Sequence, residues 1–197
     1  VIKKTEEIME DSEYQGVRLS LDAYLDKTRI PLKIDISTGD VITPCEISFS
    51  YQLMFENRTI PLLAYPPETV LAEKLETILS RGEANTRLRD FYDVYILQRE
   101  DFVVTPDALC HALLATCRKR GHEDLLHTYA SILNEVRQSG AMRAQWMKYQ
   151  TDFDYAAGIT WDTVLDTVET LCMKTLDDHA FGDELPQEES QFEMHLL

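Results

Sequence analysis

The chain has 197 residues, of which 44% are hydrophobic and 27% are charged, an ordinary composition for a globular protein. This length suffices for one domain, or two small ones, with a hydrophobic core. The absence of any apolar run of about 18 residues excludes a transmembrane helix. Because acidic residues follow the first few positions, we also expect no secretory signal. These observations favour a globular protein that does not enter membranes.

The charge of the chain limits its partners. The formal net charge is -16, from 19 Lys and Arg residues against 35 Asp and Glu residues. Proteins that bind nucleic-acid duplexes usually carry a basic stripe, because neutralising phosphates supplies most of their affinity. Here the only dense basic cluster is Arg118-Lys119-Arg120, with Arg81, Arg87 and Arg89 upstream. The charge therefore disfavours extended nucleic-acid binding, but it allows a phosphate-bearing ligand held by a few cations.

The four cysteines give no sign of a metal site or of disulfides. Cys45, Cys110, Cys117 and Cys172 have no Cys-x-x-Cys spacing and no histidine at a zinc-ligand interval. We expect structural free thiols, which are usual in the reducing cytoplasm. Glycine-rich phosphate loops of the G-x-G-x-x-G or G-x-x-x-x-G-K type are absent from the sequence.

The first third of the chain has the alternation of apolar and polar residues that is typical of strands. We expect a short helix at 2–10 and then a hairpin, with strands at 17–25 and 30–36. Two further strands, near 47–55 and 59–64, are expected to join the same sheet.

The turn of this hairpin is expected at 26–29, which sets the register of the two strands. In that register Leu25 pairs with Ile30, Asp22 faces Lys33, and Ser20 faces Asp35.

After Pro66-Pro67 the apolar period changes from 2 to 3.6, which indicates helices. Pro67 suits a first helical turn, and Glu68 complements the positive end of the helix dipole. We expect helices at 67–81, 86–99, 106–120, 123–138, 141–150 and 161–177. The acidic residues 178–197 are expected to form a mobile tail. The chain thus divides into a β-rich part at 1–64, a helical part at 65–177 and this tail.

Three sets of charged residues interrupt otherwise apolar elements. Asp35 lies in the middle of an expected strand, where it either belongs to an exposed face with an Asp22–Lys33 pair or points into a metal–phosphate site. Lys74 lies at one edge of the apolar arc of helix 67–81. It either extends its ammonium to solvent or supplies a point charge for a triphosphate.

Asp90 and Asp93 form the third set, three residues apart on one side of an apolar helix. Such carboxylates need partners when their helix is mostly buried. One interpretation pairs Arg89 with Asp93 and lets Asp90 complement the helix N-terminus. The other interpretation assigns both carboxylates to a functional site.

Taken together, these residues closely resemble the AbiEii/AbiGii family, the nucleotidyltransferase-like toxins of abortive-infection toxin–antitoxin systems that act in phage defence. The resemblance is carried by three runs and spans roughly residues 17–150. The runs are Tyr65-Pro66-Pro67-Glu68-Thr69-Val70-Leu71-Ala72-Glu73-Lys74-Leu75, Ser80-Arg81-Gly82-Glu83-Ala84-Asn85-Thr86-Arg87 and Arg89-Asp90-Phe91-Tyr92-Asp93. Ile30 to Asp40 is similar to the third core strand of that family, and Gln145-Trp146 to its later helical segment.

The resemblance implies an α/β fold, with a partial nucleotidyltransferase-like sheet followed by a helical C-terminal domain. It implies that Asp35 is the third carboxylate of the catalytic triad and a metal ligand, and that Lys74 contacts nucleotide phosphates, with Arg81 near it. It assigns the catalytic aspartate of the next helix to Asp93 or, as the second choice, Asp90. The implied cofactors are Mg²⁺ and a nucleoside triphosphate. The implied partners are an acceptor such as tRNA and a cognate antitoxin, in the cytoplasm.

One part of the family pattern is missing. The first motif of the family is a Gly-Ser or Gly-Gly helix start followed by a strand that carries Asp-x-Asp, and neither precedes Asp35. The chain also begins with Val1. We therefore expect it to be the later portion of a longer gene product and to be inactive in transfer by itself. The alternative is a non-catalytic module that binds a nucleotide or the antitoxin. We further expect Asp35, Lys74 and Asp93 to converge on one cleft.

Overall fold

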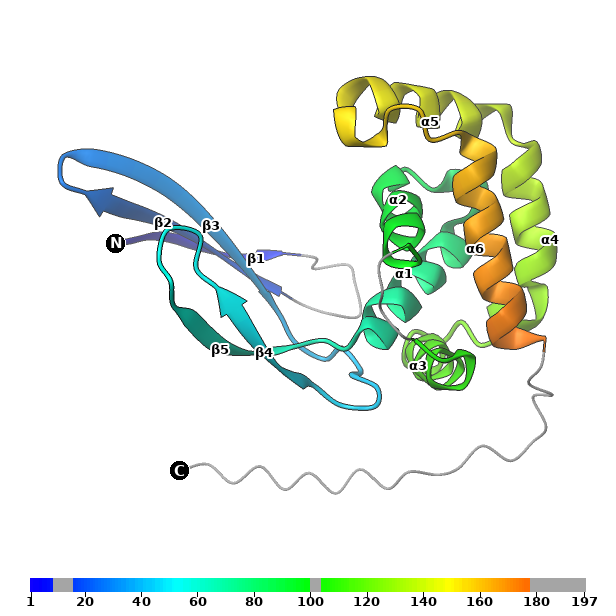
Figure 1. The fold of residues 1–197 in the computed structure, drawn as a ribbon, viewed down its shortest axis with the longest axis horizontal. Helices are drawn as coiled ribbons and strands as arrows, with labels where there is room; N and C mark the ends of the chain where they lie inside the picture. Colours follow the sequence, from blue (N-terminus) through cyan, green and yellow to red (C-terminus); the bar gives the residue numbers. More distant parts are fainter. Residues whose placement is uncertain (9–15, 100–103, 178–197) are drawn as a thin grey trace.

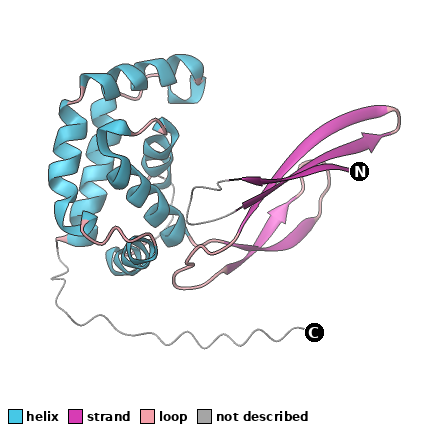
Figure 2. Cartoon of the chain, turned by 180° about the vertical axis from the view of Figure 1, so that it is seen from behind, coloured by secondary structure: helices cyan, strands magenta, loops and turns pink. Residues whose placement is uncertain are grey.

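The structure is a computed structural model that describes residues 1–8, 16–99 and 104–177. These residues form five β-strands and six α-helices, and the strands lie on one side of the molecule while the helices lie on the other (Figure 1). The view from behind shows the same separation (Figure 2). The expected α/β fold class is confirmed. The acidic tail expected at 178–197 lies outside the described residues.

The strands form two antiparallel sheets. The first sheet has the order β1 (Ile2–Ile8), β2 (Gly16–Leu25) and β3 (Thr28–Ser37), and the second pairs β4 (Ile47–Gln52) with β5 (Thr59–Ala64). The expectation that all these strands share one sheet is wrong. The segment after β3 is tied to the first helix, because the Thr43 N–H donates to Thr69 Oγ1 at 2.9 Å and the Thr69 hydroxyl donates to the Thr43 carbonyl at 3.0 Å. This attachment leads the chain away from β3, so that β4 pairs with its neighbour in sequence.

The expected helix at 2–10 is also wrong, since residues 2–8 form β1. Its sequence, Ile-Lys-Lys-Thr-Glu-Glu-Ile, is rich in residues with good helix propensity. However, β1 completes backbone hydrogen bonds along β2, with Thr5 opposite Leu19 and Glu7 opposite Val17. This long-range pairing overrides the weak local preference.

The hairpin of β2 and β3 is present, but its register differs from the expected one by two residues. Leu25 pairs with Thr28, so that the turn contains only Asp26 and Lys27. Asp26 has φ = 52°, a left-handed conformation that aspartate tolerates better than most residues and that two-residue hairpin turns require. A shift of two residues keeps every side chain on its expected face but changes its partner. Arg18, rather than Ser20, is therefore opposite Asp35.

The six helices match the expected ones within a few residues at each end. They are α1 (Pro67–Arg81), α2 (Leu88–Leu97), α3 (Pro106–Lys119), α4 (Leu125–Gln138), α5 (Gly140–Asp152) and α6 (Trp161–Leu176), with 3₁₀ turns η1 (Gly82–Ala84) and η2 (Asp154–Ala156). Local signals explain this agreement. The hydroxyls of Thr105, Ser139 and Thr160 accept hydrogen bonds from backbone N–H groups in the first turns of α3, α5 and α6.

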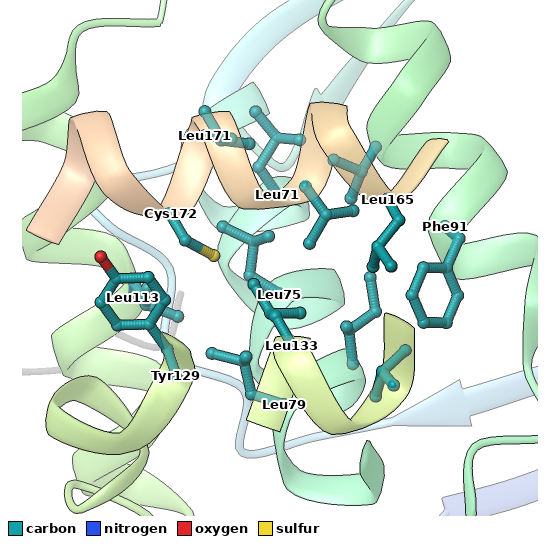
Figure 3. Close-up of a cluster of buried hydrophobic side chains, with 14 of the residues drawn as sticks. Leu71, Leu75, Leu79, Phe91, Leu113, Tyr129, Leu133, Leu165, Leu171 and Cys172 are labelled. Atoms are coloured by element: carbon teal, nitrogen blue, oxygen red, sulfur yellow. The ribbon is translucent and has the colours of Figure 1, made fainter. Parts of the chain in front are cut away.

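The hydrophobic core is helical. Leu71, Leu75 and Leu79 of α1 point toward side chains of the surrounding helices, among them Leu133 and Leu165 (Figure 3). Among the described residues, every member of the buried hydrophobic cluster lies between 71 and 176, and no residue of β3, β4 or β5 is buried. No helix of the described part is long and apolar enough to cross a membrane. The four cysteines are free thiols, as expected.

Candidate functional site

Lys74 lies in the middle of α1, next to the face of that helix that enters the core. Leu71, Leu75 and Ile78 are fully buried, and the Lys74 side chain is mostly buried, with about a fifth of it exposed. A lysine in this position has an apolar stem against the core and an ammonium group that needs a polar partner. Its partners come from α2, which packs against α1.

Asp90 and Asp93 supply those partners, because a spacing of three residues places both carboxylates on the same side of α2. The Lys74 ammonium donates to Asp93 Oδ2 at 2.6 Å and to Asp90 Oδ1 at 3.3 Å. Arg89 also approaches Asp93 Oδ2, at 3.7 Å, but its side chain is mostly exposed. Asp93 therefore makes the expected contact with Arg89 and, in addition, an ion pair with Lys74. The assignment of Asp90 and Asp93 to a functional site stays a prediction.

The cluster of Lys74, Asp90 and Asp93 has two features of a binding site. An ammonium group has three N–H donors, and the two aspartates account for two of them, which leaves one for a ligand. Asp90 Oδ2 is a buried oxygen that has no hydrogen-bond partner among the described residues. A buried acceptor without a donor is unfavourable, and a ligand hydroxyl or a water would relieve that cost. The site therefore presents one donor and one acceptor from adjacent helices.

Asp35 has a different partner from the residues of this cluster. It is exposed on β3, and Arg18 donates to both of its oxygens, from Nε to Oδ1 at 2.6 Å and from Nη2 to Oδ2 at 2.7 Å. These hydrogen bonds are the main reason that the pKa of Asp35 is lowered. Within residues 1–8, 16–99 and 104–177, no hydrogen bond or ion pair connects Asp35 with Lys74, so their convergence on one cleft stays a prediction.

The residues described here do not make a magnesium site by themselves. No group of three or more His, Cys, Asp or Glu side chains in the described part of the chain is placed to hold a metal ion. Both oxygens of Asp35, the residue expected to bind the metal, already accept hydrogen bonds from a guanidinium group. Mg²⁺ prefers several oxygen ligands, so the donor set around Asp35 does not fit it.

Arg81, the second residue expected to bind phosphate, ends α1 two turns after Lys74. Seven residues correspond to about 10 Å along a helix, on nearly the same face. Arg81 is exposed and forms no ion pair with any other described residue. It is therefore available to an anion that approaches along this face of α1.

Four aromatic residues near Asp93 were not among the candidate site residues expected from the sequence. Tyr92 of α2 packs against Tyr155, with ring centroids 4.7 Å apart, and Tyr155 also lies near Tyr149 and Phe153 of the α5 region. Burial and a hydrogen bond with Tyr155 raise the pKa of Tyr149, and the negative charge of Asp93 raises it further. The spacing of four residues between Tyr149 and Phe153 was the available signal, since it places both rings on one side of a helix.

Comparison with known proteins gives a family match that covers most of the chain. The family model described as nucleotidyl transferase AbiEii toxin, type IV TA system, matches residues 1–167. The chain belongs to the AbiEii family. No curated protein and no solved structure shows a significant match to it. The AbiEii assignment places the chain among nucleotidyltransferase toxins of type IV toxin–antitoxin systems, which implies an antitoxin as a partner.

Proposed function

We propose that this AbiEii chain binds a nucleoside triphosphate through Lys74, as part of a toxin that transfers a nucleotide to an acceptor such as tRNA. The observation that carries the proposal is the cluster of Lys74, Asp90 and Asp93. These are the residues that the family resemblance marks as functional, and they meet within 2.6–3.3 Å although they come from two helices. Arg81, on the same side of α1, adds a second cation for the phosphates.

In this proposal each residue of the cluster has a separate role. Asp93 and Asp90 hold the ammonium group of Lys74 in one position, and its remaining N–H donates to a phosphate oxygen. The unpartnered Asp90 Oδ2 accepts a hydrogen bond from a hydroxyl of the ligand. The cluster of one cation and two anions has a net charge of -1, so that phosphate binding by Lys74 alone is weak and salt-sensitive.

The same geometry supports the proposal that the chain by itself does not transfer nucleotides. Nucleotidyltransferases generally use a divalent metal with the nucleoside triphosphate, and that metal needs carboxylates. The described residues offer no such set, and Asp35 is engaged by Arg18. The proposed cellular location is the cytoplasm, where four free thiols are expected to persist.

Calorimetric titration tests the binding part of the proposal. Each nucleoside triphosphate is titrated into the chain and into Lys74→Ala, with Lys27→Ala in the hairpin turn as the matched control. We expect weak binding by the original chain, a loss of about tenfold or more in Lys74→Ala because a charge-assisted hydrogen bond is removed, and no change in Lys27→Ala. Equal affinities of all three proteins, or no binding by any, would contradict the proposal.

A labelling experiment tests the transfer part. The chain is incubated with labelled nucleoside triphosphates, Mg²⁺ and bulk tRNA, and incorporation into RNA is measured. We expect none above the level seen without protein. Incorporation that is lost in Lys74→Ala would instead show that this chain is a complete transferase and that its metal ligands lie outside the sets considered above.

A further inference from the structure

The four aromatic residues beside Asp93 form a surface that the proposed phosphate site does not use. We call Tyr92, Tyr149, Phe153 and Tyr155 the aromatic patch. The Tyr155 and Phe153 side chains are exposed, at 49% and 41%, and their ring centroids lie 5.4 Å apart at 31°. Rings of this size are usually buried more deeply, because their apolar area favours removal from water. Exposed rings that gather on one surface offer stacking faces to a ligand.

Stacking and hydrogen bonds fix the positions of the rings in the aromatic patch. Trp146, which is buried, stacks on Tyr149 with centroids 5.3 Å apart at 24°, and its indole N–H donates to the carbonyl of Ile159. Gln150 donates from its side-chain amide to the carbonyls of Ala156 and Ile159, which fixes η2 against α5. The hydroxyls of Tyr149 and Tyr155 are hydrogen-bonded to each other at 2.8 Å. The rings are therefore positioned before any ligand arrives.

The aromatic patch adjoins the charged cluster at Tyr149, which lies close enough to Asp93 and Arg89 for their charges to act on its hydroxyl. Tyr92, the neighbour of Asp93 in α2, packs its ring against Tyr155. Arg89 lies one helical turn before both Tyr92 and Asp93, and 77% of its side chain is exposed. An anion bound near Lys74 or Arg89 would thus have an aromatic surface next to it.

We propose that the aromatic patch binds the base of the nucleoside triphosphate whose phosphates contact Lys74. This inference rests on the proposed function and adds the site of the base to it. Nucleobases stack on tyrosine and phenylalanine rings largely without regard to their identity, because every base has a π-face. An exposed patch of rings is therefore expected to bind all four bases with similar affinity. Arg89 adds a cation for a phosphate or for the face of the base.

The test compares a ligand that has a base with one that does not. Nucleoside triphosphates and inorganic tripolyphosphate are titrated separately into the full chain and into Tyr155→Leu and Tyr155→Phe. Tyr24→Leu is the matched control, because Tyr24 is a similarly exposed tyrosine, 57% against 49%, at the second-to-last position of β2. We expect the original chain to bind nucleoside triphosphates about tenfold more tightly than tripolyphosphate.

The variants then separate the two proposals. We expect Tyr155→Leu to lower the affinity for nucleoside triphosphates to that for tripolyphosphate, with tripolyphosphate binding unchanged, which also shows that the site is still folded. Tyr155→Phe, which keeps the ring, should retain most of the difference, and Tyr24→Leu all of it. If Lys74→Ala lowers the affinity for both ligands but Tyr155→Leu lowers neither affinity, the phosphate site is supported and the base site is refuted. If Lys74→Ala changes the affinity for neither ligand, the proposed function itself is refuted.

A third titration distinguishes the base of the nucleotide from a base of the acceptor. A short single-stranded RNA is added to the same set of proteins. If Tyr155→Leu loses RNA binding and keeps its full affinity for nucleoside triphosphates, the aromatic patch serves the acceptor, and the proposal is overturned.

Discussion

The helical and β-rich regions of this protein differ in how they use apolar residues. In the helices, apolar side chains alternate with polar ones at a period of 3.6 and meet in one core, where Leu71, Leu75 and Phe91 have no exposed surface. In the strands, apolar side chains are just as regular but remain exposed, such as Ile34 at 47% and Phe49 at 48%. The same kind of pattern thus produces a core only where a second layer covers it.

This difference indicates which interactions hold each region. Burial of apolar area stabilises the helices, whereas the sheets depend on backbone hydrogen bonds and on cross-strand pairs such as Arg18–Asp35. Small sheets without a covered face are marginal in water. We therefore expect the two regions to respond very differently to the same chemical or mutational change.

Thiol labelling should show the largest difference. Cys45 is exposed in the segment before β4, whereas Cys110, Cys117 and Cys172 are buried in the helices. Burial raises the pKa of Cys117 to about 12, so that it holds little thiolate at pH 8. We expect Cys45 to react with a maleimide at least about a thousandfold faster than the other three, whose reaction requires unfolding. Mass spectrometry counts the labels, and rapid modification of all four thiols would contradict a well-packed core.

Truncation of one apolar residue in each region should give the next largest effect. Leu75→Ala leaves a cavity beneath α1 and is expected to lower the free energy of unfolding by about 4 kcal/mol. Ile34→Ala in β3 removes a similar side chain from an exposed surface, and its effect should stay within about 0.5 kcal/mol. Denaturant titrations followed by circular dichroism at 222 nm measure both. Equal effects would mean that the β3 face is covered in solution.

The features of this fold that the sequence could predict are local ones. Helix positions follow from local signals, namely the 3.6-residue period, Pro67 and the capping hydroxyls, and they agree with the structure within a few residues. The expectation that Lys74 and Asp93 lie in one cleft agrees with the hydrogen bond between them, but the direct Lys74 ion pairs with Asp93 and Asp90 were not expected from the sequence. The helix signals lie within short stretches of chain.

Features that depend on distant residues were predicted poorly. The strand at 2–8 is stabilised by pairing with β2, which its own composition does not indicate. The hairpin register depends on whether Asp26 adopts a left-handed conformation, and a shift of two residues made Arg18 the partner of Asp35. The aromatic patch combines side chains from α2, α5 and the η2 turn, which are adjacent only in the folded chain.

Ion pairs also differ between the two regions. Glu76 of α1 is buried, accepts a hydrogen bond from Arg120 and lies 2.7 Å from His122 Nδ1. The Arg18–Asp35 pair, in contrast, is exposed. Glu76→Gln removes the buried carboxylate charge that contacts Arg120 and His122, and it should lower the free energy of unfolding by about 3 kcal/mol. Asp35→Asn should leave the melting temperature unchanged, because exposed pairs contribute little. A large loss in Asp35→Asn would show that the sheet depends on this pair.

The smallest expected effect lies at the junction of the two regions, where Glu73 of α1 is close to Asp40 in the segment after β3. Burial raises the pKa of Glu73 above its ordinary value of 4.5, and the charge of Asp40 raises it further. The folded protein therefore holds this proton more tightly than the unfolded chain does. As the pH rises through the interval between the two pKa values, the free energy of unfolding falls, and it stays lower at neutral pH.

Glu73→Gln removes this penalty, so we expect a slightly higher melting temperature than that of the original chain at pH 7 and no difference below about pH 4. Glu83→Gln, at an exposed position of the η1 turn, serves as the control for the loss of one carboxylate charge. A lower melting temperature of Glu73→Gln at pH 7 would mean instead that the ionised carboxylate stabilises the junction through Lys74 and Arg120, the two cations whose charges oppose the rise in its pKa.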